Sequence, residues 1–224
     1  MERHHVAALC LLIVIAVVCA LAGREFLKMY EPDEIVPGPG VTKIDNLSTY
    51  FAALAGTSSD TKVYVLDSGI PGATALVLGG THPNEPAGFM TAVVLTEHAT
   101  VREGKLIVIP QVCSSGFTCT DPLEGYPQSF SIQSKSRTRS FRLGARGSNP
   151  LIEWPDPLVF LQYPSGQQLS GNEVRNLNRS YPGRPEGTVT EQVAYAVMQL
   201  IDREKVDLAF DLHEAAPEIP IINA

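Results

Sequence analysis

His82 and Glu85 lie three residues apart in a loop between a predicted strand and a predicted helix. In an open α/β sheet, the loop that leaves the carboxyl end of a strand is where ligands bind. At this spacing an imidazole nitrogen and a carboxylate oxygen can face one point, and a catalytic zinc commonly takes two His and one Glu. The alternative is a histidine that caps a turn, beside a glutamate stabilised by the helix dipole. The pair by itself does not decide between the two.

A second histidine, His213, follows a later predicted strand over residues 206–212. The helix predicted before that strand begins with the capping box Thr188-Val-Thr-Glu191. A strand that is reached through such a helix is expected to run parallel to its predecessors. His213 is then expected at the same carboxyl edge of the sheet as His82 and Glu85. The sequence therefore predicts that the three side chains form one metal site.

The elements that position these residues are typical of an α/β domain. Apolar runs predict strands, of which the first two form an antiparallel pair, over residues 62–67, 73–78 and 105–110. Asp45 or Asn46 can cap a helix that runs to Ala55 and stops at Gly56. A further helix is predicted over 86–97, with Pro86 in its first turn. We expect a mixed, largely parallel central sheet flanked by helices and preceded by one N-terminal hydrophobic helix.

The composition indicates a globular protein. The 224 residues suffice for one sizeable core, and 44% are hydrophobic while 18% are charged. A formal net charge of −7 argues against nucleic acid as a partner, because phosphate binding needs a basic surface. Cys113 and Cys119 either close a small disulfide loop or remain two thiols.

Residues 5–23 are predicted to be a transmembrane anchor or a signal peptide. Val6 to Gly23 carry no charge and are just long enough to cross a bilayer, for which about 20 residues are typical. The Pro- and Gly-containing residues 24–43 are predicted to be a tether, and residues 44–224 the main domain. This organisation predicts a membrane-anchored or secreted protein whose body lies outside the cytoplasm.

Residues 113–175 are rich in Ser, Pro and Gly, which predicts a long, largely irregular segment. It contains a basic cluster formed by Lys135, Arg137, Arg139, Arg142 and Arg146. The cluster is either a solvated surface or an electropositive rim that gathers anionic substrate.

Three ordered motifs within residues 73–214 resemble the zinc carboxypeptidase superfamily, namely His82-x-x-Glu85, Asn178-Arg179 and Asp211-Leu212-His213. The motif His82-x-Asn84-Glu85 followed by Ala87-Gly88 is more similar to the succinylglutamate desuccinylase/aspartoacylase branch of that superfamily. The resemblance implies a zinc carboxypeptidase-like fold and three zinc ligands, His82, Glu85 and His213. It implies substrate contacts from Asn178 and Arg179, and Arg175 is a candidate second cation. A guanidinium matches a carboxylate with two hydrogen bonds, which suits a substrate with a free carboxylate.

The function that the resemblance implies is zinc-dependent hydrolysis of an amide bond in a small carboxylate-bearing substrate. Deacylation of an N-acyl amino acid is the first choice. One alternative is a metallocarboxypeptidase that acts on peptides. Another is a non-catalytic fragment that binds zinc and ligand. The expected partners are a small-molecule or peptide substrate with a free carboxylate, and a membrane through the N-terminal segment.

The sequence departs from the family pattern in two places. Pro83 stands where the branch often has Gly. The family's catalytic Glu lies on a strand well beyond the last zinc histidine, so the general base is expected beyond residue 224 and the chain is expected to be incomplete. Glu214 and Glu218 are the later carboxylates. Alternation along an extended strand turns Glu214 away from a metal that His213 faces.

Overall fold

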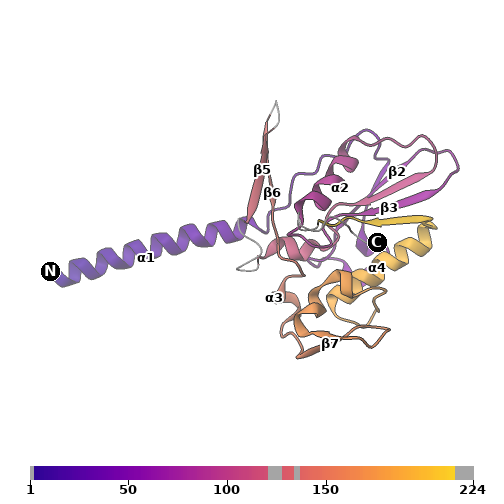
Figure 1. The fold of residues 1–224 in the computed structure, drawn as a ribbon. Helices are drawn as coiled ribbons and strands as arrows, with labels where there is room; N and C mark the ends of the chain where they lie inside the picture. Colours follow the sequence, from indigo (N-terminus) through magenta and orange to yellow (C-terminus); the bar gives the residue numbers. More distant parts are fainter. Residues whose placement is uncertain (1–2, 121–127, 134–136, 215–224) are drawn as a thin grey trace. The chain divides into compact units, whose positions relative to one another are not determined.

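The structure is a computed structural model, and it describes residues 3–120, 128–133 and 137–214. The chain divides into two compact units, Met1–Asp33 and Glu34–Ala224, which are described separately. The first contains α1 (Arg3–Lys28), a helix of 26 residues (Figure 1). Within the described residues it is the one helix long and apolar enough to cross a membrane. The predicted N-terminal hydrophobic helix is therefore confirmed as a helix.

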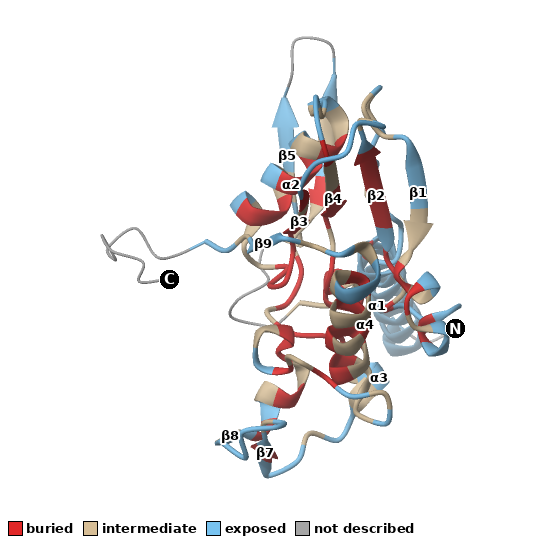
Figure 2. Ribbon diagram, turned by 90° about the vertical axis from the view of Figure 1, so that its right-hand side faces the viewer, coloured by how far each residue is buried: buried red, intermediate tan, exposed pale blue. Residues whose placement is uncertain are grey.

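The second unit is built on a five-stranded sheet with the order β1-β2-β4-β3-β9 (Figures 1 and 2). The strands are β1 (Lys43–Asn46), β2 (Lys62–Asp67), β3 (Thr74–Leu78), β4 (Lys105–Ile109) and β9 (Leu208–Asp211). β1 and β4 pair with β2 antiparallel, whereas β4 and β9 pair with β3 parallel. The predicted mixed sheet is confirmed, with parallel pairing concentrated around β3.

One predicted pairing is wrong. The strands over 62–67 and 73–78 were expected to be antiparallel neighbours, but β4 lies between them. After β3 the chain passes through α2 (Pro86–His98) and returns as β4, parallel to β3. Such a crossover places the next strand beside its predecessor, so the other edge of β4 takes β2, with Tyr64 opposite Val108.

Two helices cover the two faces of the sheet. Leu76 and Leu78 of β3 pack in one cluster with the apolar face of α4 (Val189–Glu204), while Val77 between them packs with α2 through Ala92. This division follows from the alternation of side chains along a strand. The predicted capping box is present at the start of α4, and that helix ends before Lys205, which has a positive φ of 53°.

The helix predicted from residue 46 to Ala55 is wrong. The chain forms β1 and then two single 3-10 turns, Leu47–Thr49 and Ala52–Leu54. Asn46 has extended backbone and its side chain caps nothing, because residues 43–46 hydrogen-bond to β2. The Asp60 carboxylate instead accepts from the backbone and hydroxyl of Ser48. Strand pairing has overridden the local preference for a helix.

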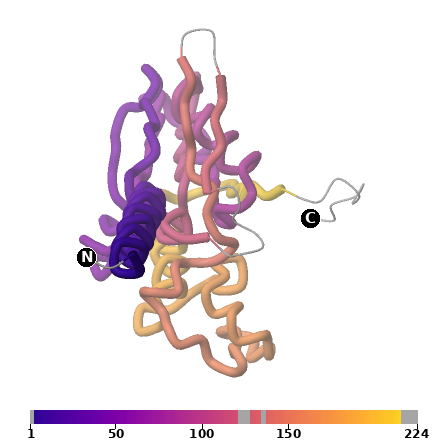
Figure 3. The backbone as a smooth tube through the Cα atoms, turned by 90° about the vertical axis from the view of Figure 1, so that its left-hand side faces the viewer, coloured from indigo at the N-terminus to yellow at the C-terminus, as the bar shows by residue number. Residues whose placement is uncertain are grey.

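The irregular segment after β4 contains more structure than predicted (Figure 3). It includes two hairpins, one short helix and 3-10 turns: β5 (Ser129–Gln133) with β6 (Thr138–Arg142), β7 (Val159–Leu161) with β8 (Gln168–Ser170), α3 (Pro150–Glu153), η3 (Ser114–Thr118), η4 (Gly171–Arg175) and η5 (Leu177–Arg179).

The predicted basic cluster is divided among separate contacts. Arg139 makes two hydrogen bonds to the Glu97 carboxylate of α2, and Arg137 bonds the carboxylate of Glu34. The Arg142 guanidinium lies over the Phe117 ring, 5.7 Å from its centre. Arg139 and Arg142 hold the hairpin β5–β6 against the domain. Lys135 lies outside the described residues.

Part of the predicted tether belongs to the second unit. The backbone of Val36 donates to the Glu97 carboxylate, and the backbone of Gly38 donates to Thr96. Thr42 donates to the carbonyl of Val65 in β2. The division into anchor, tether and domain at residues 23 and 43 stays a prediction.

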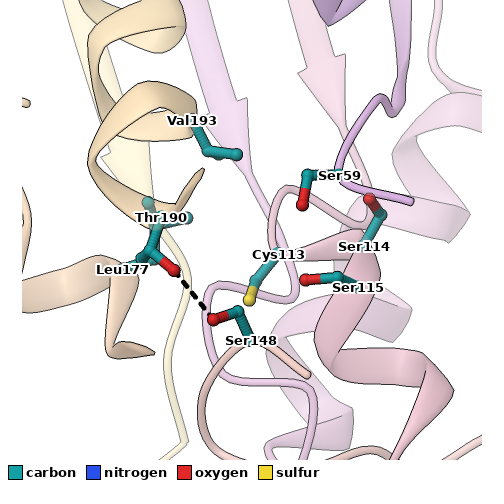
Figure 4. Close-up of a pocket in the computed structure, with 8 residues that line it drawn as sticks. All are labelled: Ser59, Cys113, Ser114, Ser115, Ser148, Leu177, Thr190 and Val193. Carbon is teal, nitrogen blue, oxygen red and sulfur yellow. Dashed lines mark hydrogen bonds between the residues drawn. The ribbon is translucent and has the colours of Figure 1, made fainter. Parts of the chain in front are cut away.

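All four cysteines are thiols in this structure, so Cys113 and Cys119 do not form a disulfide. Cys113 is buried, and burial raises the pKa of its thiol to about 12, which makes it unreactive at neutral pH. It borders a cavity of about 10 Å³ that is also lined by Ser148 and Thr190, whose hydroxyls form a hydrogen bond (Figure 4). The cavity has room for one water molecule and not for a substrate.

Candidate metal and substrate site

The candidate metal site lies at the carboxyl edge of the sheet, where β3 and β9 end together. Leu78 is opposite Asp211 in the parallel pairing, so the loops that carry His82 and His213 leave the sheet side by side. Gly88 in the first turn of α2 allows this approach. A Cβ added there would lie 2.4 Å from the carbonyl oxygen of Leu212, so a larger residue would push the helix away from His213.

His82, Glu85 and His213 converge on one point. The Glu85 carboxylate bridges the two imidazoles, with His82 Nδ1 at 2.7 Å from Oε1 and His213 Nδ1 at 2.9 Å from Oε2. One ligand atom from each residue lies within 4.8 Å of the others. His82 is only 2% exposed. Two imidazole nitrogens and a carboxylate oxygen that face each other are a donor set that fits zinc.

Asn176 orients the first histidine. Its side-chain oxygen lies 3.0 Å from His82 Nε2, and its amide nitrogen donates to the Glu173 carboxylate at 2.7 Å. The second bond fixes which end of the amide is the acceptor, so His82 Nε2 donates to Asn176 and Nδ1 is the ring nitrogen that faces Glu85 and the site. Such partners of metal-binding histidines set the tautomer and ring orientation. Sequence reasoning missed Asn176, although it stands two residues before the Asn178-Arg179 motif.

Asp211 orients the second histidine, His213. Its carboxylate lies 3.2 Å from His213 Nε2 and accepts a hydrogen bond of 2.6 Å from the Thr81 hydroxyl. His213 therefore also directs Nδ1 toward Glu85. The sequence motif contained Asp211, but nothing in the spacing indicated this role.

The two charged residues of the ligand set have shifted pKa values. Burial disfavours the charged form of Glu85, but hydrogen bonds from His213, His82 and the backbone of Glu214 outweigh it and hold its pKa well below the ordinary value. The hydrogen bonds of His213 to Asp211 and Glu85 raise the pKa of His213 to about 9. In the metal-free protein at neutral pH, a proton on His213 therefore occupies a position that a metal would take.

We expect the zinc affinity to increase with pH up to about 9. Each zinc that binds must displace the proton of His213, so the affinity should rise about tenfold per pH unit. The stability of the metal-free protein depends on pH in the opposite direction. The raised pKa stabilises the metal-free fold below the ordinary pKa of 6.5, and this contribution is lost as the pH rises to about 9.

Competition titrations against a chelator between pH 6 and 9.5 would measure this dependence. Calorimetry in two buffers of different ionisation enthalpy would count the released protons. A zinc affinity that does not change between pH 6 and 8 would contradict the assignment of His213 as a ligand.

Arg146 is the cation nearest to the ligand set among the described residues. Its Nη1 lies 3.6 Å from Glu85 Oε1, and the side chain is partly exposed. The hypothesis of an electropositive rim therefore fits this member of the basic cluster. Its position in the sequence, within a long irregular segment, gave no sign that it reaches the metal ligands.

Asn178 and Arg179 line an open hollow of about 400 Å³. Its other walls are formed by Tyr181 and by residues of the β7–β8 hairpin, Gln162, Gln167 and Leu169. The backbone of Asn178 donates to the side-chain oxygen of Asn176, which links the hollow directly to the partner of His82. Arg179 is partly exposed and lies 3.9 Å from Glu173.

Arg175 is not part of that hollow. Its guanidinium makes two hydrogen bonds to Asp156, at 2.9 and 3.1 Å, and a third to the carbonyl of Ser148. Both charged side chains are mostly buried. The contacts are those of an ion pair that holds the segment around Asp156 in place, and they do not support a role in substrate binding.

The carboxylate of Glu214 is engaged at the start of α2. Its backbone donates to Glu85 Oε2, and its carboxylate accepts a 3.0 Å hydrogen bond from the backbone of Ala87 at the start of α2. A carboxylate is stabilised at a helix N-terminus by the backbone donors and the helix dipole. Glu218 lies outside the described residues.

The fold and the site define a mixed α/β domain with a His/Glu/His centre at the carboxyl edge of its sheet. No family model and no curated protein matches the chain. Solved structures that are similar include the ectoine utilization protein EutE from Ruegeria pomeroyi, at 28% identity and a TM-score of 0.40, over 68% of this chain and 32% of that one.

Two further similar structures carry family names. A succinylglutamate desuccinylase from Silicibacter sp. has 24% identity and a TM-score of 0.41, over 70% of this chain and 34% of its own. A succinylglutamate desuccinylase/aspartoacylase from Rhodobacter sphaeroides has 19% identity and a TM-score of 0.43, with the same coverage. The chain spans about a third of the length of these proteins. The latter two carry the name of the branch that the sequence motifs resemble.

Proposed function

We propose that this chain is the metal-binding part of a zinc-dependent amide hydrolase that deacylates N-acyl amino acids. The observation that carries the proposal is the convergence of His82, Glu85 and His213 within 4.8 Å. Asn178, which lines a hollow together with Arg179, is bonded to Asn176, the partner of His82. The order of the motifs along the sequence supports the same activity.

Each residue of the site has a distinct task in this proposal. His82, Glu85 and His213 would hold the zinc ion, which when bound would act as a Lewis acid toward water and the acyl carbonyl. Asn176 and Asp211 keep the imidazoles in the tautomer that presents Nδ1. Arg146, which lies beside Glu85, stabilises negative charge that develops on the acyl oxygen. Arg179 holds the substrate carboxylate and orients the amide bond.

A binding protein without turnover is the second candidate, and one observation favours it. Among the described residues that contact the ligand set, the carboxylates already have hydrogen-bond partners, and Glu214 caps α2.

A peptide with a free carboxylate would use the same cation as an N-acyl amino acid. A panel of N-acyl amino acids and short peptides would therefore separate a deacylase from a carboxypeptidase.

We expect Arg179→Gln and Arg175→Gln to have different effects. Loss of Arg179 removes charge-assisted hydrogen bonds to the substrate, worth about 1.5–3 kcal/mol, so binding of an N-acyl amino acid should weaken roughly 10- to 100-fold. Loss of Arg175 leaves Asp156 without its partner, which should lower the free energy of unfolding by about 1–3 kcal/mol and leave binding nearly unchanged.

Calorimetric titration and thermal unfolding of the zinc-loaded chain would measure both quantities. Arg137→Gln is the matched control, because Arg137 pairs with Glu34 on the surface and should change neither quantity. A loss of binding at Arg175 equal to that at Arg179, with stability unchanged, would refute the division of roles.

We also propose that the domain lies outside the cytoplasm, either anchored by α1 or secreted. The length and apolar composition of α1 support this location. A reporter enzyme that works only outside the cytoplasm should be active when it is fused after Ala224. Activity of a reporter that works only in the cytoplasm would overturn the proposed location.

A further inference from the structure

A short segment of the second unit exposes several large apolar side chains. Within residues 151–161, Leu158 is 99% exposed, Leu151 is 81% exposed and Trp154 is 72% exposed. Val159 and Leu161 of β7 are also exposed, whereas Phe160 between them is buried. The alternation fixes the outer face of β7 as apolar. Large apolar side chains exposed together in one short segment make that segment a candidate interaction site.

The charged side chains of the same segment are engaged inside the domain. The Glu153 carboxylate accepts hydrogen bonds from the backbone and hydroxyl of Thr190 at the start of α4. Asp156 is paired with Arg175. The sequence has no Lys, Arg or His from residue 147 to residue 174. The segment therefore presents apolar groups outward without a cation that would attract an anionic surface.

The connection to α1 limits what this segment can meet. The helix ends at Lys28 and the second unit begins at Glu34, so five residues lie between them. Fully extended, that connection spans about 20 Å. If α1 crosses a membrane, Glu34, where the second unit begins, stays within that distance of the end of the helix. Tryptophan and tyrosine are enriched at this interface, and the segment contains Trp154 and is followed by Tyr163.

We propose that residues 151–161 insert into the interfacial layer of the membrane that α1 crosses and so dock the domain on lipid. The partner is the uncharged, zwitterionic surface of a bilayer, because the segment offers apolar area and no free cation. This inference rests on the proposed role of α1 as an anchor. It does not depend on the proposed amide hydrolysis.

Trp154 makes the proposal directly measurable, because it is the one tryptophan among the 224 residues. The full chain is reconstituted into phosphatidylcholine vesicles whose acyl chains are either unmodified or brominated close to the headgroup. Tryptophan emission should shift to shorter wavelength relative to a tryptophan exposed to water, and the brominated lipid should quench it.

Substitutions separate docking from anchoring. Leu158→Ser combined with Leu161→Ser removes two apolar side chains, each worth roughly tenfold in partitioning, so the equilibrium constant for docking should fall by roughly a hundredfold and the quenching should weaken strongly. Ile70→Ser is the matched control, because Ile70 is 56% exposed in the turn between β2 and β3, away from the segment in sequence. It should leave the quenching unchanged.

Flotation of the vesicles distinguishes the two ways of failing. If the chain does not float with the vesicles, the proposed anchor is wrong and docking falls with it. If the chain floats but Trp154 emits as it does in water, the anchor stands and docking is overturned. A shift to shorter wavelength without quenching by bromine would indicate a protein contact, such as a second copy of the chain, and would also overturn docking on lipid.

Discussion

Replacement of His82 or His213 by alanine is expected to abolish most zinc binding, whereas the unchanged chain should hold about one zinc. Each histidine directs Nδ1 to the same carboxylate, so the loss of either leaves two ligands and an incomplete coordination shell. Metal content after dialysis against a weak chelator would measure the effect. We expect Asn176→Ala to be intermediate, with a loss of zinc affinity of about 10- to 100-fold, because it removes only the partner that orients His82.

His98→Ala is the control for these variants. His98 is exposed in the last turn of α2, at the opposite end of the helix from Glu85, and it contacts none of the three ligands in the described structure. Its loss should leave the zinc content unchanged. Full zinc retention by both the His82 and the His213 variants would reject the site.

The second large effect concerns turnover. A positioned general base commonly contributes on the order of 10²–10⁴-fold to the rate, and the described residues place no unengaged carboxylate at the ligand set. Glu214, the nearest candidate in the sequence, uses its carboxylate at the start of α2. The zinc-loaded chain of 224 residues is therefore expected to bind N-acyl amino acids through Arg179 and to hydrolyse them slowly or not at all.

Glu214→Gln tests this assignment. The substitution should leave the low rate unchanged and slightly destabilise α2, because a neutral amide caps the helix less well. Glu173→Gln is a matched comparison for the rate of hydrolysis, because the Glu173 carboxylate is bonded to Asn176. Rapid hydrolysis by the unchanged chain that is lost only in the Glu214 variant would show that the base is Glu214.

The sequence predicted that the three candidate ligands lie together because their placement depends on local signals. Apolar runs before His82 and His213 indicate strands, and the capping box before the second strand indicates the helix that makes it parallel to the first. Two parallel neighbouring strands end at one edge, so the side chains after them converge. The distance between the ligands follows from sheet topology and needs little information about packing.

The failures of prediction have the opposite cause. Arg175 was predicted as a candidate second cation for the substrate, but tertiary contacts engage it with Asp156. Arg146 reaches Glu85 from a segment without periodic pattern, so only the folded chain brings the two together. The helix predicted after Asn46 does not form for the same reason. Pairing with β2 holds the backbone up to Asn46 in an extended conformation, and the Asn46 side chain caps nothing.

The amide of Asn176 has a consequence for how this site can vary between related sequences. Its oxygen serves His82 while its nitrogen donates to Glu173 at 2.7 Å. An aspartate in place of Asn176 would still accept from His82, but it would set a second carboxylate against that of Glu173. The two positions should therefore change together, so that relatives with an aspartate in place of Asn176 should have lost the carboxylate of Glu173. An alignment in which both carboxylates regularly occur in the same sequence would contradict this coupling.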